Sequence, residues 1–397
     1  MAHTPSDPQE GQQVGDEFSD VEDIEDIEEI NTLTELGTTL IQAILEREPL
    51  VNIQDLIDAG APLWFQDNEG ISPLYAAAYV ANEKLVKIFL ADGAVWNAVD
   101  NFGNTAGDIA LSMNDEGIYN LIRDAGIRSE LLLTALSSGS EPPQSSSSLI
   151  ISDGDISAVG STDAFLASNL QYTVDAHGQE ICLLKLEDGS TVGVMMGWER
   201  EIMSRTVDEL CSDHPRLEGG LRVLNVGFGL GIIDGFLQRL PKPPSLHVII
   251  EAHPGVLAHI REQGWHQRPG VKIMEGKWQD VVQRKEFLDL GRFDVVYTDT
   301  FAENYYELYK FFMLLPNLMA GPEARFSFFN GLGATNALFY DVYSRVSECH
   351  LSNIGAHVSW SNVQVDGDRD KERWGETRKY FTQPLYHLPI AQLKQTV

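Results

Sequence analysis

Hydrophobic and polar positions in the second half of the chain alternate between two periods. Short apolar runs, each as long as a buried strand, recur between stretches long enough for a helix. After the first strongly apolar run, Ile232, Ile233, Phe236 and Leu240 follow helical spacing. The runs predict strands at 221–226, 246–251, 271–275, 293–299, 325–330, 357–365 and 378–382. Repeated strand–helix units predict an α/β fold with a doubly wound, mostly parallel sheet and a ligand at the carboxyl ends of its strands.

The first half of the chain has a different pattern, an internal repeat with an offset of 33 residues. Residues 56–61 match residues 89–94, and residues 67–70 match residues 100–103. A period of 33 is the length of an ankyrin repeat, which is a turn followed by two helices. The sequence therefore predicts a repetitive, mainly α-helical domain over residues 31–135.

One segment of this repeat resembles the ankyrin consensus G-x-T-P-L-H-x-A-A. Residues 70–78 read G-I-S-P-L-Y-A-A-A, with Ser72 in place of Thr and Tyr75 in place of His. The following copy is degraded and has Ala106 where the consensus has Pro. Ankyrin arrays bind proteins, so the resemblance implies that this domain recruits a partner. Packing against the rest of the chain is the alternative role.

Two further segments bound these domains. Residues 1–30 contain eleven acidic residues and no Lys or Arg, which predicts a disordered acidic tail. Apolar residues recur every third position from Phe18 to Ile30, so this tail could become helical on a partner. Residues 136–162 are rich in Ser and Pro and predict a linker. The domain that contains the strands then covers residues 163–397.

Composition limits the protein classes that fit the chain. The 397 residues are 43% hydrophobic, and no apolar run reaches the ~18–20 residues of a membrane span. The first residues lack the basic and apolar parts of a signal peptide, so we expect the protein in the cytoplasm and nucleus. The three cysteines lie far apart, which predicts reduced thiols and no metal site.

Charge is distributed unevenly along the chain. The net charge is −31, and residues 1–160 hold 29 acidic and 5 basic residues. Phosphates would be repelled there, so we expect no direct contact with nucleic acid. A basic protein partner fits this charge. A solubilising surface is the simpler interpretation.

The most specific chemical signal is a glycine-rich turn after the strand predicted at 221–226. Glycines stand at 227, 229 and 231, and Glu251 ends the next predicted strand. Glycines let the backbone approach a nucleotide, and an acid at that position binds ribose hydroxyls. A dinucleotide fingerprint needs another glycine where this chain has Ile232. The G-x-G-x-G form is instead the one seen in methyltransferases that use S-adenosylmethionine. A plain strand–helix connection is the alternative.

Five segments in order resemble guanidinoacetate methyltransferase. Its motifs M-M-x-W-E-x-x-x-M, V-G-F-G-M, W-I-I-E, G-L-W-E-D-V and L-Y-D-T-Y match residues 195–203, 226–230, 248–251, 276–281 and 297–301. Together with ankyrin repeats, these motifs resemble the fungal protein arginine N5-methyltransferases, the type IV enzymes, over nearly everything after residue 30. The resemblance implies a class I (Rossmann-like) methyltransferase sheet after an ankyrin-repeat domain, and S-adenosylmethionine as cofactor.

The resemblance also implies roles for individual residues. Glu199 and Asp299 would be catalytic, because two carboxylates can clamp a guanidinium and one can accept its proton. Substrate contacts are expected from Trp198, Glu199, Asp299 and Asn330. Cofactor contacts are expected from Tyr172, Met203, Gly227, Phe228, Gly229, Leu230, Gly231, Ile232, Glu251, Ala252, His253, Lys277, Trp278 and Asp299.

Each of these residues also has a structural interpretation. Asp299 could be a helix N-cap, and Glu199 could be a solvated surface acid. Trp198 and Met203 could be core residues. Phe228 is expected to support the glycine turn, and Trp278 to pack beside the adenine.

One departure from the family bears on the substrate. Guanidinoacetate methyltransferase has N-L-T-S-W-G after its fifth strand, where it holds the substrate carboxylate, whereas this chain reads N-G-L-G-A-T from Asn330 to Thr335. This loss favours an arginine within a protein. The resemblance implies that one methyl group is placed on the δ nitrogen (N5) and that the target class is ribosomal proteins. We expect a monomer. The alternatives are a methyltransferase of a free guanidino metabolite and a non-catalytic ankyrin scaffold.

Overall fold

A computed structural model describes residues 19–137, 162–175, 178–186, 189, 191–365, 374, 377 and 379–394. The chain divides into two compact units, with the boundary between residues 122 and 123. Among the described residues, no helix is both long enough and apolar enough to cross a membrane. The linker predicted at 136–162 lies almost entirely outside the described residues.

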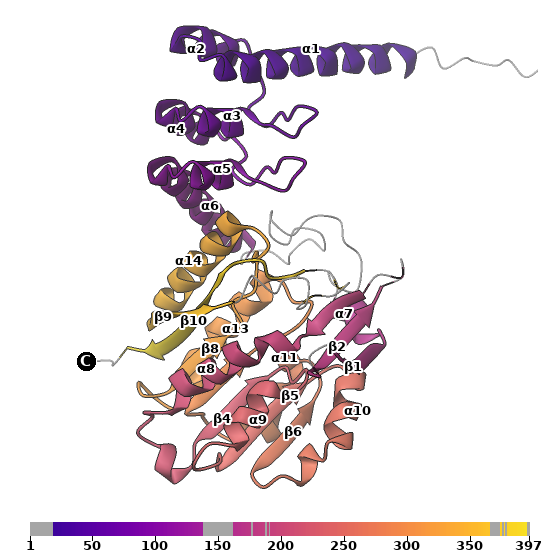
Figure 1. The fold of residues 1–397 in the computed structure, drawn as a ribbon, viewed down its shortest axis with the longest axis vertical. Helices are drawn as coiled ribbons and strands as arrows, with labels where there is room; N and C mark the ends of the chain where they lie inside the picture. Colours follow the sequence, from indigo (N-terminus) through magenta and orange to yellow (C-terminus); the bar gives the residue numbers. More distant parts are fainter. Residues whose placement is uncertain are drawn as a thin grey trace, which may run out of the picture. The chain divides into compact units, whose positions relative to one another are not determined.

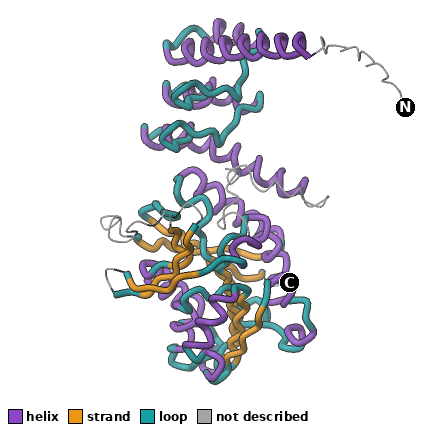
Figure 2. Tube along the Cα trace, turned by 90° about the vertical axis from the view of Figure 1, so that its right-hand side faces the viewer, coloured by secondary structure: helices purple, strands orange, loops and turns teal. Residues whose placement is uncertain are grey.

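The first unit consists of consecutive helices in pairs (Figures 1 and 2). The pairs are α1 with α2 and α3 with α4, and α5 begins a third pair with α6, which runs on into the second unit. The helices are α1 (Ser19–Leu45), α2 (Leu50–Asp58), α3 (Pro73–Tyr79), α4 (Glu83–Ala91), α5 (Ala106–Ser112) and α6 (Glu116–Ser137).

The 33-residue period is visible in the loops between these pairs. Asp67 accepts hydrogen bonds from the N–H groups of residues 69 and 71, at 3.0 and 2.8 Å. Asp100 does the same for residues 102 and 104, at 2.9 and 2.8 Å. Each helix after a loop starts at a side-chain cap, Ser72 in one copy and Thr105 in the next. Ser72 therefore fills the capping role of the consensus Thr.

The two ends of this region differ from the sequence prediction. Helix α1 begins at Ser19, inside the segment expected to be disordered, where the sequence prediction allowed a helix only on a partner. Residues 1–18 lie outside the described residues. Helix α6 crosses the boundary between the units, so the second unit begins before the Ser/Pro-rich segment rather than after it.

The second unit contains a seven-stranded sheet in the order β6-β5-β4-β7-β8-β10-β9. Its strands are β4 (Arg222–Val226), β5 (Leu246–Glu251), β6 (Val271–Glu275), β7 (Val295–Thr298), β8 (Arg325–Phe328), β9 (Ala356–Gln364) and β10 (Leu385–Leu393). The pairs from β6 to β8 are parallel, and β10 is antiparallel to both of its neighbours. This is the expected parallel sheet with an antiparallel edge.

Helices cover both faces of this sheet. Alternate residues of β4 and β7 pack with α8 (Arg200–Cys211) and α9 (Ile232–Gln238) on one side. The intervening residues pack with α11 (Trp278–Val281) and α13 (Tyr305–Leu318) on the other. The second unit also contains α7 (Thr162–Leu166), α10 (Pro254–Glu262), α12 (Lys285–Leu288), α14 (Ala337–Asn353) and the short 3-10 turns η1 (Gly197–Glu199), η2 (Leu217–Gly219) and η3 (Trp265–Gln267).

Two parts of the second unit differ from the sequence prediction. The last strand is β10 and not residues 378–382, because Phe381 there packs as a fully buried loop residue among other aromatic side chains. A separate antiparallel sheet was missed; it comprises β1 (Leu170–Val174), β2 (Glu180–Lys185) and β3 (Thr191–Met195). It leads directly into η1, the turn that carries Glu199.

Candidate active site

The centre of the site is the point where the strand order reverses, between β4 and β7. Ligands of doubly wound sheets bind at the carboxyl ends of the strands at such a point. Gly227 follows β4 with φ +90°, and a Cβ there would lie 1.9 Å from the carbonyl oxygen of Asp299, which follows β7. Only glycine therefore allows these two strand ends to lie side by side.

The rest of the glycine turn has the same backbone character. Gly229 and Gly231 have φ values of 56° and 66°, and Gly231 is the N-cap of α9. A Cβ on Gly231 would lie 2.3 Å from the ring of Phe228. Phe228 thus supports the turn from below, as the sequence predicted. Leu230 and Ile232 are buried beside it.

Glu251 links the turn to the end of β5. Its carboxylate accepts the N–H of Phe228 at 2.9 Å and the N–H groups of Ala252 and His253 at 2.8 and 2.7 Å. Burial raises the pKa of Glu251, and these three donors act in the opposite direction. The predicted ribose-binding acid therefore lies beside the glycine turn.

Below the turn lies a buried polar network that sequence reasoning missed. The side-chain amide of Asn225 donates to the carbonyl of Gly227 and to both carboxylate oxygens of Asp234, each at 2.9 Å. Nε2 of His247 lies 2.9 Å from Asp234. All three side chains are fully buried. The network fixes the turn from within the core, and the only signal for it was polar residues inside apolar segments.

The two predicted catalytic acids are brought together. Glu199 is buried at 3% exposure on η1, where its Oε1 accepts the backbone N–H of Met196 at 3.3 Å. Burial and the negative charge of Asp299 raise the pKa of Glu199 well above its usual range. Asp299 is partly exposed, and burial of its carboxyl raises the pKa to about 7. Glu199 is therefore not a solvated surface acid, and Asp299 does not cap a helix, because Asn304 caps α13.

Such a pair of carboxylates is suited to a cation. Two like charges in a low-dielectric site disfavour each other's ionised state, and a positive ligand between them relieves that cost. A guanidinium is planar and presents N–H donors in a fork that matches carboxylate oxygens. The geometry therefore supports recognition of a guanidinium, with Asp299 able to take up a proton near neutral pH.

Aromatic side chains lie beside the acid pair. Trp198, next to Glu199, has its ring centroid 5.5 Å from that of Trp374 and 5.8 Å from that of Tyr380. The hydroxyl of Tyr380 donates a hydrogen bond to Glu199. Sequence reasoning named Trp198 but missed Tyr380, because the segment that contains Tyr380 was predicted to be a strand.

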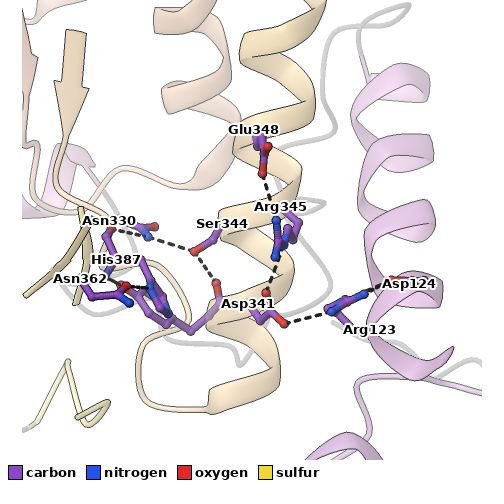
Figure 3. A network of polar contacts seen from close by, with 10 residues as sticks. Arg123, Asp124, Asn330, Asp341, Ser344, Arg345, Glu348, Asn362 and His387 are labelled. Atoms are coloured by element: carbon purple, nitrogen blue, oxygen red, sulfur yellow. Dashed lines mark hydrogen bonds and ion pairs between the residues drawn. The ribbon is translucent and has the colours of Figure 1, made fainter. Parts of the chain in front are cut away.

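Asn330 is held by neighbouring residues of the protein. Its side-chain amide donates to Ser344 Oγ at 3.0 Å and to the carbonyl of His387 at 3.2 Å (Figure 3). Its backbone N–H donates to the hydroxyl of Tyr386 at 2.9 Å. The contacts of Asn330 therefore connect β8 to α14 and β10, and its role at the substrate stays a prediction.

Two predicted cofactor residues pack within the protein on the α8 side of the sheet and at β1. Met203 is fully buried, and its sulfur lies 3.4 Å from the hydroxyl of Tyr297. The ring of Tyr172 stacks on His259, with centroids 4.0 Å apart. Burial raises the pKa of the Tyr172 hydroxyl. The contact of Met203 agrees with its alternative as a core residue, and the contact of Tyr172 with a cofactor stays a prediction.

Three more predicted residues surround the ends of β5 and β6. His253 is buried, with Nε2 3.0 Å from the carbonyl of Phe165. Lys277 forms an exposed ion pair with Asp163 at 2.6 Å. Trp278 is buried, and its Nε1 donates to Glu303 at 3.0 Å. The polar atoms of these side chains thus have protein partners, and their contacts with a cofactor stay predictions.

Glu303 is another residue that sequence reasoning missed. Besides Trp278, it accepts hydrogen bonds from Gln279 at 3.0 Å and Thr300 at 2.6 Å. It follows Asp299 in the loop after β7, where Ala302 has a positive φ of 61°. These contacts hold the loop that carries Asp299.

Comparison with known proteins agrees with this geometry. The family model of guanidinoacetate N-methyltransferase matches residues 189–315, which include both acids, the glycine turn and Glu251. A protein from Cryptococcus neoformans named protein arginine N-methyltransferase 2 is 39% identical over 380 residues, covering 91% of this chain and 97% of the relative.

Proteins of the same name from two other fungi also match. The Emericella nidulans protein is 36% identical over 341 residues, which cover 77% of each chain. The Saccharomyces cerevisiae protein is 33% identical over 330 residues, covering 77% of this chain and 76% of the relative. The sheet order, the glycine turn and these matches define a Rossmann-like methyltransferase. The chain belongs to the protein arginine N-methyltransferase 2 family.

Proposed function

We propose that the protein transfers one methyl group from S-adenosylmethionine to the δ nitrogen (N5) of arginine residues in a protein substrate. The observation that carries the proposal is the pair of neighbouring acids, Glu199 and Asp299, at the strand ends beside the glycine turn. The relatives' name supports arginine as the acceptor.

The glycine turn and Glu251 fit the proposed cofactor. Three glycines with positive φ give the turn its tight backbone conformation, and the carboxylate of Glu251 lies at the adjacent strand end. When bound, S-adenosylmethionine supplies a methyl group activated by its sulfonium. The turn and Glu251 would hold the nucleoside part of this cofactor.

The two acids would orient the acceptor and manage its proton. Free arginine has a pKa above 12, so the guanidinium arrives charged and favours ionised carboxylates on both acids. As the new N–C bond forms at Nδ, the proton on that nitrogen must leave, and Asp299 accepts it. The bond between the methyl group and the sulfonium sulfur would break at the same time, so the products would be a methylated, still cationic guanidinium, neutral S-adenosylhomocysteine and a protonated Asp299. Near-attack alignment of this kind contributes several kcal/mol to lowering the barrier.

The position of the methyl group is proposed from the family resemblance. In guanidinoacetate the methylated nitrogen bears the alkyl group, and the equivalent atom of arginine is Nδ. The changed sequence after Asn330 supports a peptide-linked arginine, because such a residue presents no free carboxylate at that place. A ribosomal protein is the target class that the resemblance implies.

We further propose that the helix pairs of the first unit are ankyrin repeats that recruit this substrate. The equivalent bonds of Asp67 and Asp100 support a turn-and-two-helices repeat of 33 residues. The acidic composition of this part of the chain favours a basic partner. Action as a monomer in the cytoplasm and nucleus completes the proposal.

A second candidate function is methylation of a free guanidino metabolite. It is favoured by the match of residues 189–315 to guanidinoacetate N-methyltransferase. The two candidates are separated by incubating the protein with methyl-labelled S-adenosylmethionine and cell extract. Label in protein supports the first candidate, whereas label confined to small molecules supports the second and contradicts the first.

A further inference from the structure

Tyr380 lies in the immediate surroundings of Glu199. Oε1 of Glu199 accepts two hydrogen bonds, one from the backbone of Met196 and one from the hydroxyl of Tyr380. Both donors bind the same oxygen. Among the residues that the structure describes, the other oxygen of Glu199 is therefore the one that can face a guanidinium.

Tyr380 is held firmly although it lies outside any strand or helix. Its ring meets Trp374 edge-on, with centroids 4.7 Å apart. Gly193 of β3 lies beside it, since a Cβ there would lie at the ordinary contact distance of 3.4 Å from the Tyr380 ring. Two residues later, the backbone N–H of Thr382 donates to the carbonyl of Ala334 at 2.9 Å. The hydroxyl is thus held in place from several sides.

The hydroxyl of Tyr380 can offset the unfavourable electrostatics of the pair Glu199 and Asp299. Glu199 is buried close to the negative charge of Asp299, and both facts work against its ionised form. A hydrogen bond donated to a carboxylate favours the ionised form, and a bond to a charged group is stronger than one between neutral groups. Within the part of the chain that the structure describes, Tyr380 is the side chain that donates such a bond to Glu199.

We propose that Tyr380 is a positioning residue for the methyl transfer: its hydroxyl stabilises the charge of Glu199 and fixes Oε1, so that Oε2 faces the guanidinium of the acceptor. This inference rests on the proposed function. Tyr380 acts through Glu199 and takes no part in the bond changes.

The variant that tests this role is Tyr380→Phe, which keeps the ring and removes the hydroxyl. Tyr75→Phe is the matched control, because Tyr75 donates a similar bond to a buried acid, Asp100, in the first unit at 3.0 Å. The probe is Nα-acetyl-arginine methylamide, a peptide-linked arginine without neighbours. Its binding is measured by NMR titration between pH 5.5 and pH 9 in the presence of S-adenosylhomocysteine.

Tyr380→Phe should raise the Kd of the probe by about 10- to 100-fold, the usual effect of losing a hydrogen bond to a charged group. The pH below which binding weakens should also move upward, because Glu199 then holds its proton more tightly. Tyr75→Phe should change neither quantity. A purely structural role would lower the melting temperature without moving the pH dependence. An unchanged Kd and pH dependence in Tyr380→Phe would overturn the inference.

A second readout separates this inference from the proposed function. The infrared carboxyl band of Glu199, identified by its loss in Glu199→Gln, reports protonation in the empty protein. The band should persist to higher pH in Tyr380→Phe than in wild type. If the band shifts in Tyr380→Phe but the wild-type protein does not bind the probe, arginine recognition is contradicted. The effect of Tyr380 on Glu199 would still stand. Probe binding with an unshifted band would retain arginine recognition and overturn the role of Tyr380.

Discussion

Two buried acids, one in each unit of this protein, have pKa values that are shifted in opposite directions. Asp100 in the first unit is buried, yet donors from Asn104, Phe102 and Tyr75 outweigh that burial and hold its pKa below the usual range. Glu199 in the second unit is also buried, but it has fewer donors and a second acid nearby, so its pKa is raised. An acid surrounded by donors supports the fold, whereas a pair of acids with few donors is suited to a cationic ligand.

The largest expected effect comes from Asp299. Asp299→Asn keeps the size of the side chain and removes its charge and basicity, so kcat should fall on the order of 10²–10⁴. Glu199→Gln should mainly weaken substrate binding. The measurement is steady-state methyl transfer together with cofactor affinity, since Asp299 lies beside the glycine turn.

Asp289→Asn is the control for Asp299, because Asp289 is an exposed acid paired with Lys285. Its kcat should stay at the wild-type value. Full activity in Asp299→Asn and Glu199→Gln together would contradict the assigned roles.

The next effect concerns the glycine turn. Gly227→Ala places a Cβ against the carbonyl of Asp299 in a strained backbone conformation, which costs about 1–3 kcal/mol. Cofactor affinity measured by calorimetry should fall by roughly 10- to 100-fold. Gly219→Ala is the control, since its Cβ would meet nothing within 4 Å. Equal affinity in the two variants would show that the turn does not bind the cofactor.

Removal of the first unit tests whether its acids and helices serve recruitment. The truncated chain has to keep α6, because this helix continues into the second unit. There Nη1 of Arg123 lies 3.7 Å from Oδ2 of Asp341 (Figure 3). A chain starting at Glu116 keeps this helix. It should bind cofactor normally and methylate the protein substrate with kcat/KM lower on the order of 10-fold or more. Unchanged kcat/KM would contradict recruitment, and loss of cofactor binding would indicate a structural role.

The smallest effect concerns stability against pH. The pKa values of Glu199 and Asp299 are raised, to about 7 for Asp299, so these two carboxyl groups bind more protons in the folded protein than in the unfolded chain between about pH 4 and pH 7. Their contribution to stability should therefore fall as pH rises through this range. Glu199→Gln removes the repulsion, so in calorimetry it should melt a few degrees above wild type at pH 8. The difference should shrink at pH 5.

Asp100 should show the opposite dependence. Because its pKa is lowered, it contributes stability that is present above about pH 4 and is lost as pH falls further. Asp100→Asn should flatten the acid side of the unfolding curve of the first unit. Parallel pH dependences for Asp100→Asn and Glu199→Gln would contradict the contrast between the two units.

The sequence predicted the parts of this molecule that rest on local patterns. Six of the seven proposed strands are present at the expected places, since buried strands give continuous apolar runs. The glycine turn and Glu251 followed from spacing alone. The motifs of the family resemblance also located Glu199 and Asp299, and in the folded protein the charge of Asp299 acts on Glu199.

The remaining features depend on contacts between distant residues. Tyr380 and Phe381 read as a strand, because an apolar loop packed by aromatic rings has the same composition. The network of Asn225, Asp234 and His247 could not be predicted, since its hydrogen bonds join residues that only the fold brings together. The roles of these residues therefore depend on tertiary contacts, which composition does not reveal.

The central claim is that Glu199 and Asp299 orient a protein arginine for methylation at its internal nitrogen. The most direct measurement is fragmentation mass spectrometry of peptides from a protein that the wild-type enzyme has labelled. Retention of the methyl group on the side chain after loss of the terminal guanidino part is the predicted result. Loss of the methyl group together with that terminal part, in every labelled peptide, would contradict the claim.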